Sequence, residues 1–229
     1  MKHSAELILC LALLAGCQAS GIRSFWNNVP LLEEDINVSE DRFAQFAELA
    51  AAAPEEEAIS ALNVLFDKLN SDTVAYYIYS DWVDAAFYNL LSPCRSAALY
   101  STAVDRMVAD GILTESDMEP RIQRREWFQY NLFGAQAIVP GAVIKERTLV
   151  LVFDQGCPSC KEALSSLAAA WPDVRRLAVC CGYGPVPAVP GWEYLNDNQS
   201  SAVFDPRMTP IYFVVAADGT VETSYTLVF

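Results

Sequence analysis

The stretch "TLVLVFDQGCPSCKEAL", residues 148–164, constrains the fold more than any other part of the chain. Its first six residues are almost continuously apolar and rich in β-branched side chains, which predicts a strand buried on both faces. A short turn follows, and Cys157 and Cys160 then stand three apart at the start of a helix predicted over Pro158 to Ala170. A buried strand that leads through a turn into a helix is typical of an α/β sheet.

Three further segments complete this predicted sheet: "RRLAVCC", "PIYFVVAA" and "TVETSYTLVF", the last two joined by a hairpin turn at Asp218 and Gly219. Strand, helix and strand in sequence imply a right-handed crossover and a parallel pair. The final hairpin adds antiparallel strands. This order predicts the core of a thioredoxin-like sheet.

The first half of the chain has a different periodicity. Apolar residues recur there at spacings of three and four, which predicts amphipathic helices. The predicted helices lie in "SEDRFAQFAELAAAA", "EEEAISALNVLFDKLN", "TVAYYIYSDWVDAAFYNLL", the region from about Ser96 to Ala109, and the region from about Thr114 to Leu132. We therefore expect an all-α domain over 39–134, a linker over 135–147 and an α/β domain over 148–229.

The N-terminus has the layout of an export signal, with Lys2 followed by an apolar run from Leu7 to Leu14 that is too short to span a membrane. The ending Leu14-Ala15-Gly16-Cys17 resembles the lipobox of bacterial lipoproteins. This resemblance implies a signal peptide over 1–16, lipid on Cys17 and a tether over 17–38. An ordinary signal peptide with a chance cysteine is the alternative. The lipid would anchor the chain to a membrane of the bacterial cell envelope, facing the periplasm.

Charge and composition exclude several classes of function. Without residues 1–16 the chain keeps 14 basic and 28 acidic residues, and a surface of that sign repels the phosphate backbone of nucleic acids. The one histidine, His3, lies in the signal segment, so the mature chain has none for a catalytic dyad or a metal site. No glycine-rich phosphate loop is present. We expect no cofactor, no metal and no nucleic-acid partner.

The Cys157–Cys160 pair has three interpretations. A zinc site needs four ligands, but Cys94, Cys180 and Cys181 include no second Cys-x-x-Cys pair. A structural disulfide is the second interpretation, since an exported chain meets an oxidising environment. The third is a redox centre, which a Cys-x-x-Cys between a buried strand and a helix favours.

The sequence also resembles a known family. "CPSC" at 157–160 and "FDPRMTPIYFVVAADGTV" at 204–221 are similar to motifs of the TlpA and ResA kind of thioredoxin-like proteins, which are membrane-tethered thiol–disulfide oxidoreductases. The first half is similar to an uncharacterised helical domain that precedes such modules in bacterial lipoproteins. The resemblance implies that Pro210 is a cis-proline facing the cysteines and that Thr209 and Pro210 bind the client. It implies a reductase rather than an oxidase, with protein thiol or disulfide clients and a membrane or periplasmic electron donor.

The predicted roles follow from position. Pro158 at the first helical position would make Cys157 the helix cap, where the positive end of the helix stabilises its thiolate, so Cys157 attacks and Cys160 resolves. Ser159 would donate a hydrogen bond to that thiolate or simply lie at the surface. Cys180 and Cys181 are expected to be buried apolar residues, with a third redox cysteine as the alternative.

The chain also departs from thioredoxin itself. Thioredoxin carries a buried acid six residues before its first active-site cysteine and a tryptophan directly before it, and these positions hold Leu151 and Gly156 here. A second function class therefore stays open, in which a tethered binding lipoprotein grips a partner with its helices and the thioredoxin-like module is redox-inert.

Overall fold

The computed structural model describes residues 21–154, 156–182, 189–196, 199–223 and 225–227. The predicted signal peptide and Cys17 lie outside these residues. The chain divides into two compact units, Met1–Arg125 and Glu126–Phe229. The division falls within a helix, earlier than the boundary expected after residue 134.

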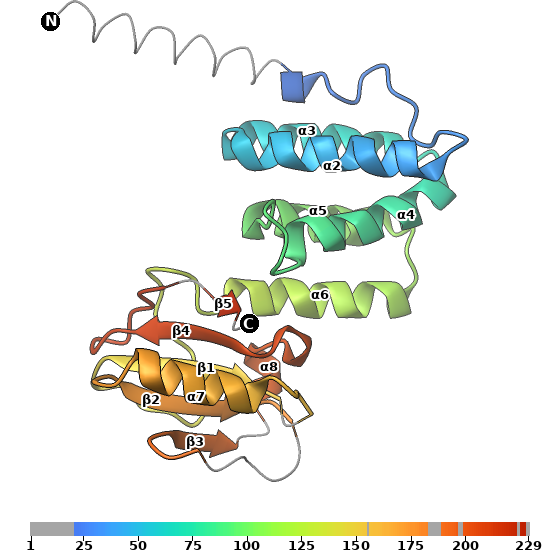
Figure 1. The fold of residues 1–229 in the computed structure, drawn as a ribbon. Helices are drawn as coiled ribbons and strands as arrows, with labels where there is room; N and C mark the ends of the chain where they lie inside the picture. The colour runs from blue at the N-terminus through green and yellow to red at the C-terminus, as the bar shows by residue number, and fades with distance from the viewer. Residues whose placement is uncertain (1–20, 155, 183–188, 197–198, 224, 228–229) are drawn as a thin grey trace, which may run out of the picture. The chain divides into compact units, whose positions relative to one another are not determined.

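Helices form the first unit (Figure 1). They are α2 (Ile36–Ala52), α3 (Glu55–Leu69), α4 (Thr73–Val83), a π-helical continuation η1 (Asp84–Tyr88), α5 (Ala97–Asp110) and α6 (Glu115–Gln129), whose last residues belong to the second unit. Within the described residues, no helix combines the length and the apolar character that a membrane crossing requires.

Local sequence sets the ends of these helices. Asp35 accepts a hydrogen bond from the amide of Asn37, so α2 begins three residues before the predicted start at Ser39. Asp72 and Ser96 cap α4 and α5 in the same way. Gly111 ends α5 at a φ of 63°, a left-handed conformation that glycine adopts without steric cost, as predicted.

Residues of the predicted tether pack against this unit. Trp26 is fully buried, with its ring 5.2 Å from that of Phe46 and 5.8 Å from that of Tyr79. Lys68 Nζ donates hydrogen bonds to the carbonyls of Trp26 and Val29, at 2.6 and 2.7 Å. The described part of segment 17–38 is therefore not a free linker, because its aromatic side chain completes the helical core.

The second unit contains one sheet with the strand order β3-β2-β1-β4-β5. The strands are β1 (Thr148–Phe153), β2 (Arg175–Cys180), β3 (Glu193–Asn196), β4 (Ile211–Val215) and β5 (Thr226–Leu227). β1, β2 and β3 are parallel, whereas β4 runs antiparallel to β1 and β5 antiparallel to β4. The predicted parallel crossover and C-terminal antiparallel strands are confirmed.

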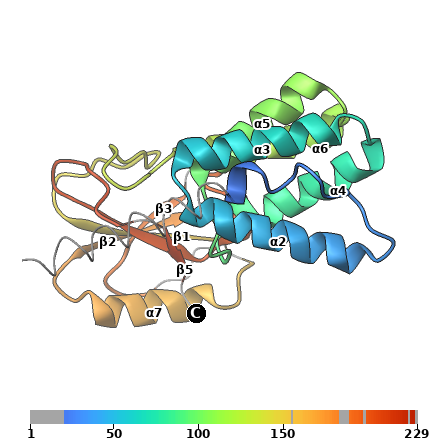
Figure 2. The same ribbon diagram turned by 90° about the horizontal axis from the view of Figure 1, so that it is seen from above.

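Helix α7 (Cys160–Ala170) covers one face of this sheet (Figures 1 and 2). Its apolar side pairs with alternate residues of the strands, in a cluster that includes Leu149, Leu151, Phe153, Ala178, Cys180, Cys160, Leu164 and Leu167. The intervening strand residues point to the opposite face. There the ring of Phe213 contacts Phe204 and Tyr225, at centroid distances of 6.1 and 5.2 Å.

The end of α6 and the turn after it also belong to the second unit. Trp127 Nε1 donates to the carbonyl of Ser201, at 3.0 Å, and the side-chain amide of Asn131 donates to the hydroxyl of Tyr225, also at 3.0 Å. These bonds tie residues 127–131 to the same part of the unit as the Phe213 cluster.

Candidate active site

The described cysteines of the second unit gather at one end of the sheet. β1 and β2 are parallel and in register, with Phe153 opposite Cys180, so both strands end at the same edge. β4 begins at this edge, because Ile211 pairs with Val152. The loop to Cys157, the end of β2 and the Thr209–Pro210 segment therefore converge there, at the carboxyl ends of the parallel strands, where α/β sheets place their chemistry.

Cys157 and Cys160 form a disulfide, with their Cα atoms 5.5 Å apart. The two residues differ in accessibility. Cys157 is half-buried, whereas Cys160 is 2% exposed and packs with Leu151, Phe153 and Leu164 beneath α7. Pro158 and Ser159 are exposed. Cys157 is therefore accessible from solvent, and Cys160 is shielded from it.

The helix starts later than the sequence suggested. α7 begins at Cys160 instead of Pro158, and Ser159 takes the position before it. Cys157 is not the helix cap: the amide of Cys160 donates to the Cys157 carbonyl over 3.3 Å, which closes a tight turn ahead of the first α-helical bond. The sulfur of Cys157 is nevertheless bonded to the first helical residue, and so lies at the positive end of α7.

Ser159 contacts Cys157. Its Oγ lies 3.4 Å from Cys157 Sγ. A disulfide sulfur carries no proton, so the serine hydroxyl is the donor in this state. The same hydroxyl is positioned to donate to a Cys157 thiolate after reduction.

The Thr209–Pro210 peptide bond is cis, as the resemblance implied. Pro210 is buried and Thr209 is half-buried, and the Thr209 hydroxyl donates to the carbonyl of Pro206, at 2.8 Å. This bond closes the turn that leads into β4.

An Asp205–Arg207 pair that the sequence analysis did not single out holds the segment before the cis-proline. Asp205 caps the 3-10 helix η2 (Pro206–Met208) by accepting from the amide of Arg207. Its carboxylate, 4% exposed, also accepts two bonds from the Arg207 guanidinium. The signal was present in "DPR", because Asp is a favoured cap and Pro a favoured first helical residue.

Cys180 is buried as expected, whereas Cys181, which follows the end of β2, is only half-buried. Cys180 is 1% exposed and belongs to the cluster beneath α7, together with Cys160. The amide of Cys181 donates to the carbonyl of Phe153, at 2.9 Å. Burial, followed by the electrostatic effects of Cys180 and of the carboxylates of Asp154 and Asp205, raises the pKa of the Cys181 thiol to about 12. This thiol is protonated at neutral pH.

Leu151 stands where thioredoxin has its buried acid, and it is fully buried in the cluster around Cys160. It has no group that can accept or donate a proton. Among the described residues, no group of three or more His, Cys, Asp or Glu side chains is arranged to hold a metal ion.

The sheet, its crossover helix and the disulfide at the helix start define a protein of thioredoxin-like fold. The solved structure of a thioredoxin-like protein from Bacteroides caccae matches this chain with a TM-score of 0.68 at 18% identity, over 90% of this chain and 87% of that one. The match therefore includes helices of the first unit as well as the sheet. Comparisons with models of protein families and with curated proteins found no match.

Proposed function

We propose that the chain is a thiol–disulfide oxidoreductase of the TlpA and ResA kind that acts on protein clients. The observation that carries the proposal is the asymmetry of the pair: a half-buried Cys157, reachable from solvent, is bonded to a buried Cys160 at the start of α7. Attack on a client disulfide requires an accessible thiolate, and resolution requires a second thiol close behind it.

In the reductive direction the reaction runs in two exchanges. The Cys157 thiolate attacks one sulfur of a client disulfide, forms a mixed disulfide and releases the other client sulfur as a thiolate. Cys160, once deprotonated, attacks Cys157 Sγ, forms the disulfide seen here and releases the second client thiolate. Two electrons pass to the client, and a dithiol donor reduces Cys157–Cys160 again.

Three neighbouring residues support these steps. The Ser159 hydroxyl stabilises the Cys157 thiolate through the contact already present at 3.4 Å. Thr209 and Pro210 offer the client a backbone edge at the same end of the sheet. Since the Leu151 side chain has no ionisable group, water or another group must deprotonate Cys160.

Trapping tests the proposal. With Cys160→Ala, the full-length chain incubated with a disulfide-containing protein such as oxidised insulin should accumulate a mixed disulfide through Cys157. Cys157→Ala should accumulate none, and Cys94→Ala should behave as the unmodified chain. If a folded Cys160→Ala variant traps nothing, the catalytic function is wrong and a tethered binding lipoprotein becomes the better account.

The cellular setting is a separate part of the proposal. We propose that residues 1–16 are removed, that Cys17 carries lipid and that the chain faces the periplasm from a membrane of the cell envelope. The lipobox-like Leu14-Ala15-Gly16-Cys17 supports it. Mass spectrometry of the mature N-terminus should find a diacylglyceryl-modified Cys17, and an unmodified N-terminus at another residue would refute the anchor.

A further inference from the structure

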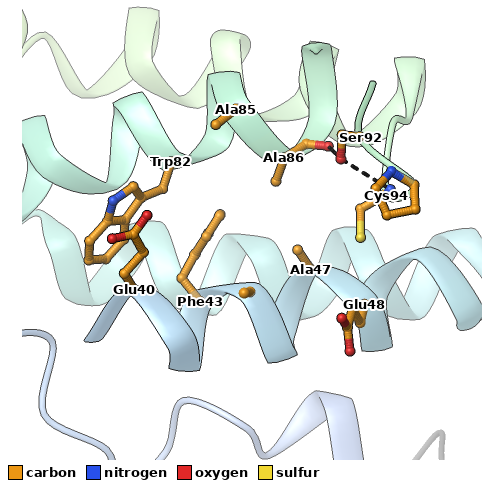
Figure 3. Close-up of a pocket in the computed structure, with 11 residues that line it drawn as sticks. Glu40, Phe43, Ala47, Glu48, Trp82, Ala85, Ala86, Ser92 and Cys94 are labelled. Carbon is orange, nitrogen blue, oxygen red and sulfur yellow. Dashed lines mark hydrogen bonds between the residues drawn. The ribbon is translucent and has the colours of Figure 1, made fainter. Parts of the chain in front are cut away.

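A groove of about 250 Å³ lies in the first unit between α2 and the segment formed by α4 and η1 (Figure 3). Phe43 and Trp82 form one part of its lining, and Pro93 and Cys94 form another. Between them lie four alanines, Ala44, Ala47, Ala85 and Ala86.

The alanines are the reason that the groove exists. α2 and η1 line it with one-carbon side chains, which are too short to fill the space between the two elements. At the end of the groove lined by Pro93 and Cys94, the Ser92 hydroxyl donates to the Ala86 carbonyl at 2.5 Å and accepts from the amide of Cys94 at 3.1 Å. These bonds between the Ser92 side chain and the backbone therefore hold this end of the groove in shape.

Its charge has one sign. Glu40 and Glu48 are its only charged lining residues, and both side chains are exposed. Within the described part of the chain neither forms an ion pair with a basic side chain. Eight residues apart on α2, they are separated by about 12 Å along the helix axis. The groove is thus an apolar slot with a carboxylate toward each end (Figure 3).

The volume and the charge of the groove indicate what kind of group it binds. A volume of about 250 Å³ falls below the roughly 300–1,000 Å³ of most small-molecule sites, and suits a single large side chain. The two carboxylates favour a positive charge on either side of that side chain. An anionic membrane surface would be repelled by them and by the net charge of −14.

We propose that this groove binds a segment of a partner protein that has one large apolar side chain flanked by lysine or arginine residues. In an extended segment, positions i and i+4 are about 13 Å apart, which matches the separation of Glu40 and Glu48. The proposal does not depend on the redox function, because no residue of the groove belongs to the dithiol site.

The test uses a defined peptide, acetyl-Lys-Ser-Phe-Ser-Lys-amide, titrated calorimetrically into the full-length chain. Saturable one-to-one binding is expected. The peptides with Ser in place of Phe, or with Glu in place of both Lys, should not bind. Binding should also weaken as salt rises, since exposed charges are screened.

Variants locate the binding. Ala85→Phe and Ala44→Phe, at exposed positions, should fill the groove and weaken binding at least tenfold, whereas Ala51→Phe, on α2 outside the groove, should not. Glu40→Gln and Glu48→Gln should each weaken it about two- to fivefold, and Glu119→Gln should leave it unchanged.

Three results would overturn the proposal, provided that the variants keep their helical circular dichroism. They are no binding at 1 mM peptide, an affinity for the peptide that Ala85→Phe does not change, and an affinity that neither Glu40→Gln nor Glu48→Gln changes. Binding to phosphatidylglycerol vesicles that Ala85→Phe abolishes would show that the groove binds a membrane surface, and this would also overturn the proposal of a protein partner.

Discussion

The carboxylate of Asp205 and the guanidinium of Arg207 meet through two hydrogen bonds of 2.9 Å, directly ahead of the cis-proline. The acid is almost completely buried and the base is half exposed. Arg175 and Glu193 form a similar two-bond pair in the same unit, at 3.0 and 2.7 Å, but there the carboxylate is 59% exposed. The two pairs share a geometry and differ in burial.

Removing one charge should therefore have unequal effects. Asp205→Asn removes the charge that the Arg207 guanidinium pairs with and places an amide group at this buried position. It should lower the free energy of unfolding by about 1–3 kcal/mol. Glu193→Gln should cost less than about 1 kcal/mol, because water compensates at an exposed pair. Urea denaturation with hydrogen exchange of residues 205–215 measures both. Equal losses of unfolding free energy in the two variants would show that the burial of Asp205 does not strengthen its pair with Arg207.

Replacing Cys180 and Cys181 together with alanine should leave the rate of disulfide exchange within about threefold of the unmodified chain. A protonated thiol is a poor nucleophile, and the half-buried Cys181 is in that state at neutral pH. Reduction of insulin disulfides, with Cys157→Ala as the inactive control, checks this. A loss of ten-fold or more in the double variant would establish a third redox cysteine.

The Cys181 thiol should also make stability depend on alkaline pH. In the unfolded chain it ionises near its ordinary pKa of 9.0, whereas in the folded chain its pKa is about 12. The unfolded state therefore loses a proton first, and the contribution of Cys181 to stability falls as pH rises from 9 toward 12. The difference in unfolding free energy between the unmodified chain and Cys181→Ala, followed from pH 8 to 11, isolates this contribution. A difference that does not change with pH would contradict it.

A buried network in the first unit gives a further prediction. Asp84 accepts hydrogen bonds from Tyr100 Oη at 2.9 Å and from Arg124 at 2.6 Å. Burial raises the pKa of Asp84, although Arg121, Arg124 and Tyr100 each act to lower it. Tyr100→Phe should cost about 1–3 kcal/mol at pH 7, while Tyr77→Phe, at a half-buried tyrosine, should cost less.

The sign of the pH dependence follows from the same hydrogen bond. The Tyr100 hydroxyl favours the charged form of Asp84, so its contribution is complete above the pKa of Asp84 and is lost as pH falls through it. The cost of Tyr100→Phe, measured by denaturation at several pH values, should therefore shrink toward acid pH. A cost that is constant from pH 7 to pH 4 would mean that Asp84 is not its partner.

The sequence predicted best those elements in which a continuous run of apolar residues stops at a clear boundary. Thr148–Phe153 is a strand over its predicted length, because six buried residues leave little ambiguity. The last predicted strand, residues 220–229, is regular only over Thr226–Leu227 within the part of it that the structure describes. Among the described residues of that segment, Val221 forms an isolated bridge with Val215. Thr223 Oγ1 accepts from the amide of Val214 and takes the place of a backbone acceptor.

Two other elements had no usable sequence signal. β3 is four residues long with exposed ends, and its pairing with β2 is a tertiary contact that no local pattern encodes. The π-helical turn after Val83 continues a helical periodicity without altering it. At the site, the cysteines and the cis-proline were found from short motifs. The Asp205–Arg207 pair was missed because its role depends on burial.

The disulfide joins residues only three apart in the chain. A crosslink of this kind hardly restricts the unfolded chain, and its contribution to stability stays below the roughly 3 kcal/mol of a 15-residue loop. Oxidation and reduction can thus alternate while the sheet and α7 remain folded. In the proposed reaction, the chain would therefore not need to pass through a partly unfolded state between its oxidised and reduced forms.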